Sequence, residues 1–364
     1  MLQETVLNLV HREMGAKMVD FGGWDMPLRY GSQVDEHNAV RDGAGMFDVS
    51  HMTIIDLRGE NVRDFLKNLL ANNVDKLTLK GKALYSCMLN EQGGIIDDLI
   101  VYLMGDEKYR LVVNAGTREK DLAWIERQAE SYSVEVRERP ELAMIAVQGP
   151  KAREVAEELL HRGLDARAKK LAPFQAAWAG DWFVARTGYT GEEGYELIMP
   201  GAEAVTFWRA LAAKGVTPCG LAARDTLRLE AGMNLYGSDM DENFTPLESG
   251  LTWTVALEPS DRDFIGRAAL IAQNEKGNIA KFVGLVLEDK GVLRNHQKIV
   301  VEGGGEGEIS SGGFSPTMNR SIALARVPAG TGDRCEVDIR GKLKAAQVVK
   351  PSFVRNGKVL VNLD

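Results

Sequence analysis

A pair of glycines followed by an apolar run with two aspartates at its head constrains this chain most. Residues 93–102 read Gly-Gly-Ile-Ile-Asp-Asp-Leu-Ile-Val-Tyr. The glycines predict a tight turn, and the apolar run predicts a strand. Carboxylates at the head of such a strand are costly unless they are hydrogen-bonded, paired or used. Because side chains alternate across a strand, Asp97 and Asp98 must point to opposite faces.

The alternation gives the two aspartates different surroundings. The face of Asp97 carries the apolar side chains expected in the core, which are Leu99, Val101 and Leu103. The face of Asp98 carries Ile100 and Tyr102 and is expected to be more open. A carboxylate aligned with a tyrosine there suits proton transfer or stabilisation of a cation. The alternative is an aspartate pair that caps backbone amides at the turn, and this segment by itself favours neither.

Composition and charge limit the class of protein. A chain of 364 residues predicts roughly two or three domains, and 45% hydrophobic with 26% charged residues is ordinary for a globular protein. The net charge of −8 argues against nonspecific binding of nucleic acid. Apolar runs stay shorter than the roughly 20 residues that span a bilayer. The N-terminal residues lack the apolar segment of a signal peptide, so we expect a cytoplasmic location.

Cysteines and histidines give no metal signature. Cys87, Cys219 and Cys335 are far apart and form no CxxC pair, so neither a zinc knuckle nor a disulfide framework is indicated. The five histidines show no HxxxH or HExxH spacing. We therefore expect no metal site.

Residues 52–138 predict a ferredoxin-like unit. Strands are expected at 52–57, 82–89, 95–103, 109–114 and 133–136, with an apolar helix from residue 62 and a second helix after Thr117. Strand, helix, strands, helix, strand is the order of a split βαβ unit. If the middle strands pair as a meander, Tyr85, Asp98, Tyr102 and Asn114 gather on one face. A slip of one residue in register would scatter them.

Two later segments look suited to a ligand. The segment 186–196 has glycines at 188, 191 and 194, which permit positive φ or close approach of the backbone to a ligand. It is not a Walker loop, and a plain hairpin loop with Tyr189 packed on the surface is the alternative. The helix predicted over 220–232 carries Arg224 and Arg228 four residues apart, with Asp225 or Glu230 as possible salt-bridge partners. Its surplus positive charge favours an anionic or polar ligand.

The remaining part, residues 281–364, is rich in β-branched residues and glycine turns and predicts a small all-β sandwich or barrel.

Six motifs in chain order resemble a known family. They lie at residues 18–24, 45–52, 93–99, 186–196, 220–232 and 310–316. Together they resemble the aminomethyltransferase, or T-protein, of the glycine cleavage system, over about residues 10–355.

The resemblance implies an α+β, three-domain folate-binding aminomethyltransferase fold around a central channel. The N-terminal folate-binding α+β domain is expected at 1–51 plus 139–240. The ferredoxin-like domain is expected at 52–138 plus 241–278. A C-terminal β-barrel or jelly-roll-like domain is expected at 279–364.

The resemblance also implies an activity. Family members take the aminomethyl group carried on the lipoyl arm of H-protein, release ammonia and pass the one-carbon unit to tetrahydrofolate, which gives 5,10-methylenetetrahydrofolate. Lipoylated H-protein and tetrahydrofolate are the implied partners, and no flavin, metal, nucleic acid or membrane is expected. The docking surface of H-protein, the oligomeric state and the polyglutamate preference are left open.

Site residues follow by position. Asp98 matches the family's catalytic aspartate, whether as a base or as an electrostatic stabiliser. Tyr189 and Glu196 match pterin-contacting positions, and Arg224 matches the folate-binding arginine. The further expected folate-binding residues are Tyr85, Asn114, Met52, Tyr102 and Arg355.

Two related functions are alternatives. A folate-binding factor that assists iron–sulfur proteins carries a Lys-Gly-Cys-Tyr type motif, where this chain has Gly232-Met233-Asn234-Leu235-Tyr236-Gly237 without cysteine. The folate domain of an N-methyl amine demethylase is fused to a flavin domain, and no GxGxxG follows a strand here. Both alternatives have less support than the transferase.

Overall fold

The computed structural model describes residues 2–303 and 305–362. The chain divides into two compact units. Unit 1 comprises residues 1–65, 75–84 and 99–227. Unit 2 comprises residues 66–74, 85–98 and 228–364.

A six-stranded sheet is the centre of unit 1, with strand order β10-β11-β12-β9-β3-β13. Its strands are β3 (Gly45–Asp48), β9 (Leu142–Gln148), β10 (Ala176–Ala179), β11 (Trp182–Ala185), β12 (Gly194–Pro200) and β13 (Thr217–Pro218). Every residue of β9 is buried. Such a continuous apolar run is typical of a strand that is covered on both faces.

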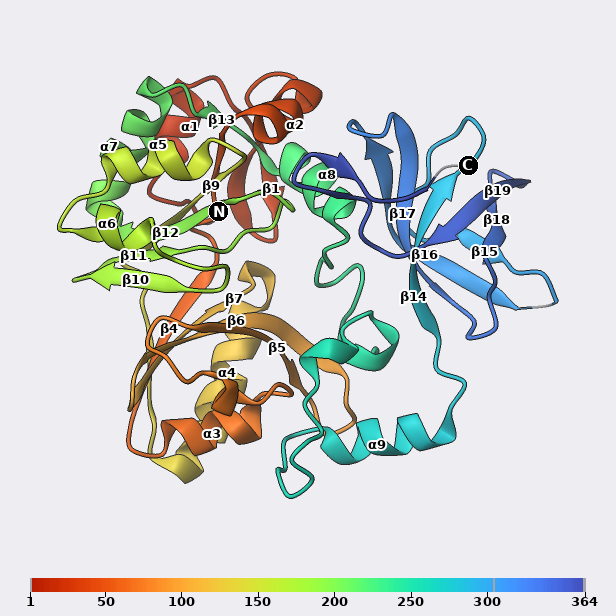
Figure 1. The fold of residues 1–364 in the computed structure, drawn as a ribbon, viewed down its shortest axis with the longest axis horizontal. Coiled ribbons are helices and arrows are strands. Elements are labelled where there is room, and N and C mark those ends of the chain that lie inside the picture. Colours follow the sequence, from red (N-terminus) through yellow and green to blue (C-terminus); the bar gives the residue numbers. More distant parts are fainter. Residues whose placement is uncertain (1, 304, 363–364) are drawn as a thin grey trace. The chain divides into compact units, whose positions relative to one another are not determined.

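Helices cover one face of this sheet. Figure 1 shows α5 (Ala152–Leu159), α6 (Leu164–Ala168) and α7 (Gly201–Ala213) together beside β9–β12. Their apolar side chains join one core with the sheet, in which Trp208 and Tyr195 are completely buried. The remaining elements of this region are α1 (Asn8–Glu13), α2 (Gln33–Asp42) and the hairpin of β1 (Lys17–Phe21) with β2 (Trp24–Arg29). One face of β12 packs into this core, which holds the strand in place.

The second sheet has the strand order β5-β6-β7-β4-β8. Its strands are β4 (Thr53–Arg58), β5 (Ala83–Leu89), β6 (Ile95–Gly105), β7 (Lys108–Val113) and β8 (Glu135–Glu138), and the helices between them are α3 (Val62–Leu69) and α4 (Arg118–Ala129). Strands β5 and β6 each begin in one unit and end in the other. The predicted order of strands and helices and the meander β5-β6-β7 are confirmed.

Strand β4 lies between β7 and β8 and is antiparallel to both, so β7 and β8 are parallel to each other with β4 between them. Together with the helix α4 that connects them, they form a split βαβ unit. The last strand, β8, begins at Glu135 instead of residue 133 because a left-handed Ser133 ends the preceding turn. The predicted helix after Thr117 is confirmed, although the Thr117 hydroxyl donates to the Asn114 carbonyl instead of capping α4.

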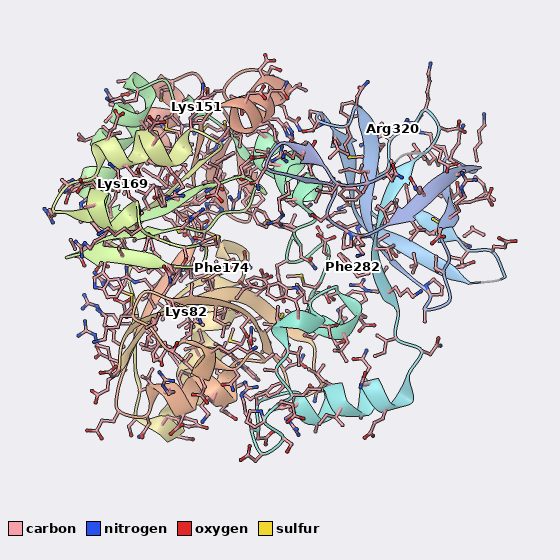
Figure 2. The ribbon with its side chains drawn as sticks, viewed as in Figure 1. Lys82, Lys151, Lys169, Phe174, Phe282 and Arg320 are labelled. Carbon is pink, nitrogen blue, oxygen red and sulfur yellow. The ribbon has the colours of Figure 1, made fainter. Side chains whose placement is uncertain are left out.

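The two sheets of unit 1 are joined by backbone contacts and a shared apolar core. The amide of Ala83 donates to the carbonyl of Phe174 (2.8 Å), and Lys82 forms a β-bridge with Gln175. Figure 2 shows Lys82 and Phe174 near each other at this junction. The core between the sheets includes Tyr102 and Phe183, whose rings meet edge to face at 5.0 Å. These contacts hold the loop that follows β11 close to the second half of β6.

Unit 2 contains a closed barrel with strand order β14-β17-β16-β15-β18-β19 (Figure 1). Its strands are β14 (Lys281–Leu287), β15 (Lys298–Val300), β16 (Glu306–Ser315), β17 (Arg320–Val327), β18 (Arg334–Ile339) and β19 (Lys342–Val349), and β20 (Val354–Arg355) pairs with β21 (Lys358–Val359). Closure removes exposed sheet edges, and the interior is filled by apolar side chains. The predicted C-terminal barrel is confirmed.

Buried polar contacts fasten the barrel to the end of α8 (Leu221–Ala231). Arg228 donates to Asp239 at 2.9 Å and to the hydroxyl of Ser311 at 3.0 Å. Glu230 accepts from Ser315 at 2.6 Å and from Thr317 at 2.8 Å. The motif at residues 310–316 thus serves the fold of unit 2, and Arg228 forms an ion pair with Asp239.

The rest of unit 2 runs from residue 232 to 280 and contains α9 (Arg267–Lys276) and two short 3-10 turns, Pro246–Glu248 and Thr252–Thr254. Gly232 opens this stretch with φ +69°, and a Cβ there would lie 1.3 Å from the carbonyl oxygen of Pro351. Only glycine fits that position. Within the part of the chain that the structure describes, no helix is long and apolar enough to cross a membrane.

Candidate functional site

Glu196 is the central carboxylate of the candidate site in unit 1. It lies on β12 and is buried. The hydroxyl of Thr187 donates to its Oε2 at 2.6 Å, and the hydroxyl of Tyr102 lies 3.3 Å from the Thr187 oxygen. Since Thr187 donates to Glu196, its oxygen accepts from Tyr102. Burial raises the pKa of Glu196, while the Thr187 hydrogen bond and the Arg224 charge oppose that rise.

Arg224 supplies the positive charge near this carboxylate. It lies on α8, and its guanidinium carbon is 4.6 Å from the centroid of the Tyr189 ring. Burial lowers the pKa of Arg224, and Tyr189 and Glu196 oppose that effect. A guanidinium over an aromatic face is attracted by the ring's quadrupole and keeps its N–H edge for a polar ligand. Four predicted residues, Tyr102, Tyr189, Glu196 and Arg224, are thus brought together within unit 1.

The glycines of the loop before β12 serve the fold. A Cβ on Gly188 would lie 2.0 Å from Oε1 of Gln148, and a Cβ on Gly194 would lie 2.3 Å from the Val147 carbonyl oxygen. Buried Gln148 donates to the carbonyls of Thr187 and Tyr195. The close approach that the glycines predict therefore occurs, but a protein side chain and strand β9 occupy the space. The loop is held in one shape beside Glu196.

Met52 and Asn114 lie at one end of the second sheet. Thr53 pairs with Val113 in the β4–β7 register, so the residues beside them, Met52 and Asn114, adjoin the same sheet end. Both are half-buried. A thioether and an amide there offer an apolar surface and hydrogen-bonding groups to a ligand.

Asp98 and Tyr85 form the candidate site in unit 2. The Tyr85 hydroxyl donates to Oδ2 of Asp98 at 2.7 Å. Asp98 is half-buried, whereas Asp97 is completely buried, as the strand alternation predicts. The ring of Tyr85 stacks on the indole of Trp253, with centroids 5.4 Å apart and planes 21° apart. A half-buried carboxylate fixed by a phenol is suited to proton transfer or to stabilising a cation.

Arg355 is the predicted residue with the least support from its surroundings. It is exposed on β20, opposite Lys358 on β21. The sequence pattern did not identify four residues next to the predicted ones, namely Thr187, Gln148, His51 and Trp253. His51 is buried with an unpartnered Nδ1, and burial lowers its pKa to about 4. Its position in the motif at residues 45–52 was the one available signal for it.

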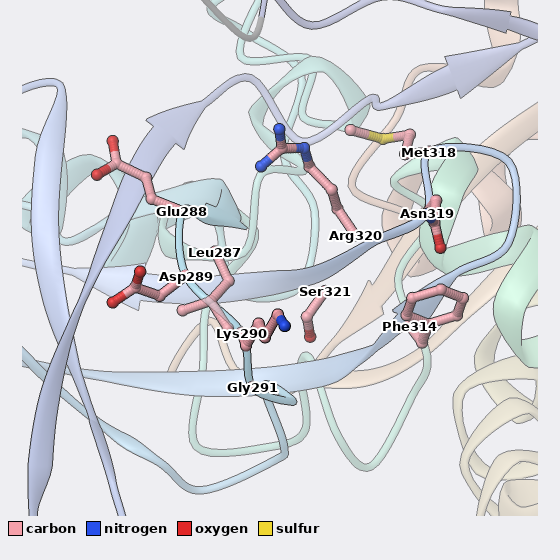
Figure 3. Close-up of a pocket in the computed structure, with 10 residues that line it drawn as sticks. All are labelled: Leu287, Glu288, Asp289, Lys290, Gly291, Phe314, Met318, Asn319, Arg320 and Ser321. Carbon is pink, nitrogen blue, oxygen red and sulfur yellow. The ribbon is translucent and has the colours of Figure 1, made fainter.

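A separate hollow of about 480 Å³ lies on the barrel of unit 2 (Figure 3). It is lined by residues 287–291 and by Phe314, Met318, Asn319, Arg320 and Ser321. Asp289 accepts from Lys344 at 3.1 Å, and Glu288 pairs with Arg334 at 3.0 Å. None of the predicted site residues lines this hollow. Across the described ranges, no group of three or more His, Cys, Asp or Glu side chains is arranged to hold a metal ion.

Comparison with known proteins matches both parts of the chain. Residues 7–259 match the GCVT N-terminal domain, and residues 281–355 match the glycine cleavage T-protein C-terminal barrel domain. This combination defines a GCVT-type protein with a C-terminal barrel.

Individual relatives narrow the class. The chain is 61% identical to the aminomethyltransferase of Nitrosococcus oceani over 99% of this chain and 96% of that one. It is 60% identical to the aminomethyltransferase of Nitrosomonas eutropha over 99% and 100% of the two chains. The crystal structure of the glycine cleavage system aminomethyltransferase T from Bartonella henselae matches with a TM-score of 0.90 and 34% identity, covering 98% and 99%.

The chain therefore belongs to the aminomethyltransferase family, the T-proteins of the glycine cleavage system. The predicted family, fold class and type of enzyme are confirmed. The roles of the individual site residues and the division into three domains stay predictions.

Proposed function

We propose that this chain transfers the one-carbon unit of an aminomethyl group from the lipoyl arm of H-protein to tetrahydrofolate. The products are ammonia, the free lipoyl thiol and 5,10-methylenetetrahydrofolate. The observation that carries the proposal is the half-buried Asp98 carboxylate held by the Tyr85 hydroxyl at 2.7 Å, in a chain of the aminomethyltransferase family.

The chemistry needs one well-placed carboxylate. In the substrate, a CH₂ group joins the lipoyl sulfur to an ammonium nitrogen. Ammonia leaves with the electron pair of the C–N bond, and the carbon becomes cationic. One folate nitrogen attacks this carbon, and a second then displaces the thiol. The two folate nitrogens lose two protons, of which one goes to the thiolate and one must be removed.

Asp98 fits both needs of this reaction. Its negative charge stabilises the cationic carbon, and its oxygen accepts the proton that must leave. Electrostatic groups aimed at developing charge commonly contribute about 3 kcal/mol to lowering a barrier. The hydrogen bond from Tyr85 keeps one carboxylate oxygen in place during these steps.

The unit 1 group is proposed to hold the pterin. A glutamate carboxylate accepts two parallel N–H bonds from the amino-pyrimidinone edge of a pterin, in the manner of bidentate pairs. Thr187 orients the Glu196 carboxylate for this contact. Arg224 and Tyr189 supply a cation and an aromatic face for the polar and planar parts of the folate. Met52, Asn114, Tyr102, Tyr85 and Arg355 are proposed as further folate contacts.

Ammonia release from aminomethylated H-protein, with and without tetrahydrofolate, tests the proposal. We expect fast release that depends on tetrahydrofolate and on the aminomethyl group. Asp289→Asn, which changes an exposed barrel carboxylate, serves as a charge-matched control and is expected to behave as the parent. Absence of tetrahydrofolate-dependent release from the parent protein would contradict the proposed function.

The three-domain division and the cytoplasmic location remain part of this proposal. Support for the division comes from the closed barrel, whose strands all fall within the proposed third domain at 279–364.

A further inference from the structure

Trp253 combines an exposed indole with a rigidly held backbone. Trp253 is 62% exposed, whereas tryptophan residues are largely buried on average. It lies in the 3-10 turn Thr252–Thr254. The next residue, Thr254, is completely buried, and its hydroxyl donates to the Leu251 carbonyl at 2.7 Å and lies 3.5 Å from Sγ of Cys87 on β5. The turn that carries the indole is thus anchored beside β5.

The indole acts on one neighbour in particular. It stacks on the ring of Tyr85, the residue whose hydroxyl donates to Asp98. Rotation of a tyrosine about its Cα–Cβ bond swings the whole ring and moves the hydroxyl at its far end away from the carboxylate. A stacked aromatic partner restricts this motion. Trp253, Tyr85 and Asp98 therefore form a chain of contacts in which the first fixes the second and the second fixes the third.

We propose that Trp253 is a positioning residue for the Asp98 carboxylate and acts through the ring of Tyr85. The proposal rests on the proposed function of Asp98. It gives the exposed indole a role in kcat that is exerted through Tyr85. Replacing the indole should therefore have the same consequence as removing the Tyr85 hydroxyl.

A double-mutant cycle tests this coupling. The variants are Trp253→Ala, Tyr85→Phe and the two combined, with Phe174→Ala as the control for loss of an exposed aromatic ring in unit 1. We expect Trp253→Ala to lower kcat about tenfold while the KM for tetrahydrofolate changes less than about threefold. In the Tyr85→Phe background, Trp253→Ala should cause no further loss, because the hydroxyl that it positions is already gone.

A conservative variant separates positioning from folding. Trp253→Phe keeps an aromatic partner for Tyr85 and should restore kcat to within about threefold of the parent. Urea unfolding of each variant checks that the fold is retained. Independent, multiplicative losses in the double variant would overturn the proposal. So would a raised KM with unchanged kcat, which indicates direct contact with substrate, or a parental kcat in Trp253→Ala.

The outcome is distinguishable from failure of the proposed function. If Asp98→Asn abolishes turnover while Trp253→Ala is as active as the parent, only the role of Trp253 is refuted. If Asp98→Asn retains parental turnover, the proposed function of Asp98 fails, whatever Trp253 does.

Discussion

The hydroxyl of Thr187 donates a 2.6 Å hydrogen bond to Oε2 of Glu196. Both residues are buried, and Tyr102 extends the chain on the other side of Thr187. The hydrogen bond joins the loop that follows β11 to a carboxylate on β12. It fixes one oxygen of the carboxylate that we propose as the pterin ligand.

Loss of the Thr187 hydroxyl should weaken folate binding. Thr187→Val keeps the shape of the side chain but removes the donor to Glu196 and the acceptor for Tyr102. Because hydrogen bonds to charged groups commonly contribute about 1.5–3 kcal/mol, we expect the KM for tetrahydrofolate to rise at least roughly tenfold with little change in kcat. Steady-state kinetics measures both. Thr187→Ser retains the hydroxyl and should stay near the parent, and a parental KM in Thr187→Val would argue against this role.

Folate affinity should decrease on the acidic side. Burial raises the pKa of Glu196, although Thr187 and Arg224 oppose the rise. As the pH falls through this raised pKa, the carboxylate gains a proton and loses an acceptor for the pterin N–H groups. The affinity for folate is therefore highest above the raised pKa of Glu196 and declines below it.

Calorimetric titration with a stable reduced folate across this range tests the prediction. Glu196→Gln should bind weakly at every pH and lack the decline, while Glu107→Gln, at an exposed position, should follow the parent. A decline that persists unchanged in Glu196→Gln would assign the titration to another group.

The buried pair of Arg228 and Asp239 should contribute strongly to the stability of unit 2. The side chain of Asp239 is 0% exposed and that of Arg228 is 4% exposed. Asp239→Ala leaves a buried guanidinium without this carboxylate, which should cost about 3–5 kcal/mol of unfolding free energy. Urea unfolding measures the loss. The exposed pair of Lys344 and Asp289 offers the comparison, and Asp289→Ala should cost less than about 1 kcal/mol. Equal losses at the two sites would be inconsistent with this account.

Local patterns predicted much of the fold. The alternation of Asp97 and Asp98 followed from strand geometry, and the structure buries the first and leaves the second half-buried. The helix predicted over 220–232 forms over Leu221–Ala231, because its apolar residues recur at helical spacing. β-Branched residues and glycine turns predicted an all-β sandwich or barrel for residues 281–364, and the structure shows a closed barrel.

Contacts between distant segments were beyond such patterns. Gln148 and Gly188 are 40 positions apart, so the sequence could show that glycine was needed but not which side chain required it. Trp253 stacks on Tyr85 across an even longer separation. Asp239, the partner of Arg228, lies in an irregular segment after α8, where no hydrophobic periodicity predicts the contact. Predicting these contacts requires the three-dimensional fold.

Turnover by Asp98→Asn tests the central claim most directly. The change removes the negative charge and keeps the size of the side chain. Ammonia release from aminomethylated H-protein should fall by orders of magnitude, while tetrahydrofolate binding stays within about tenfold of the parent, as expected for a contact made in the transition state. Parental turnover in Asp98→Asn would contradict the account.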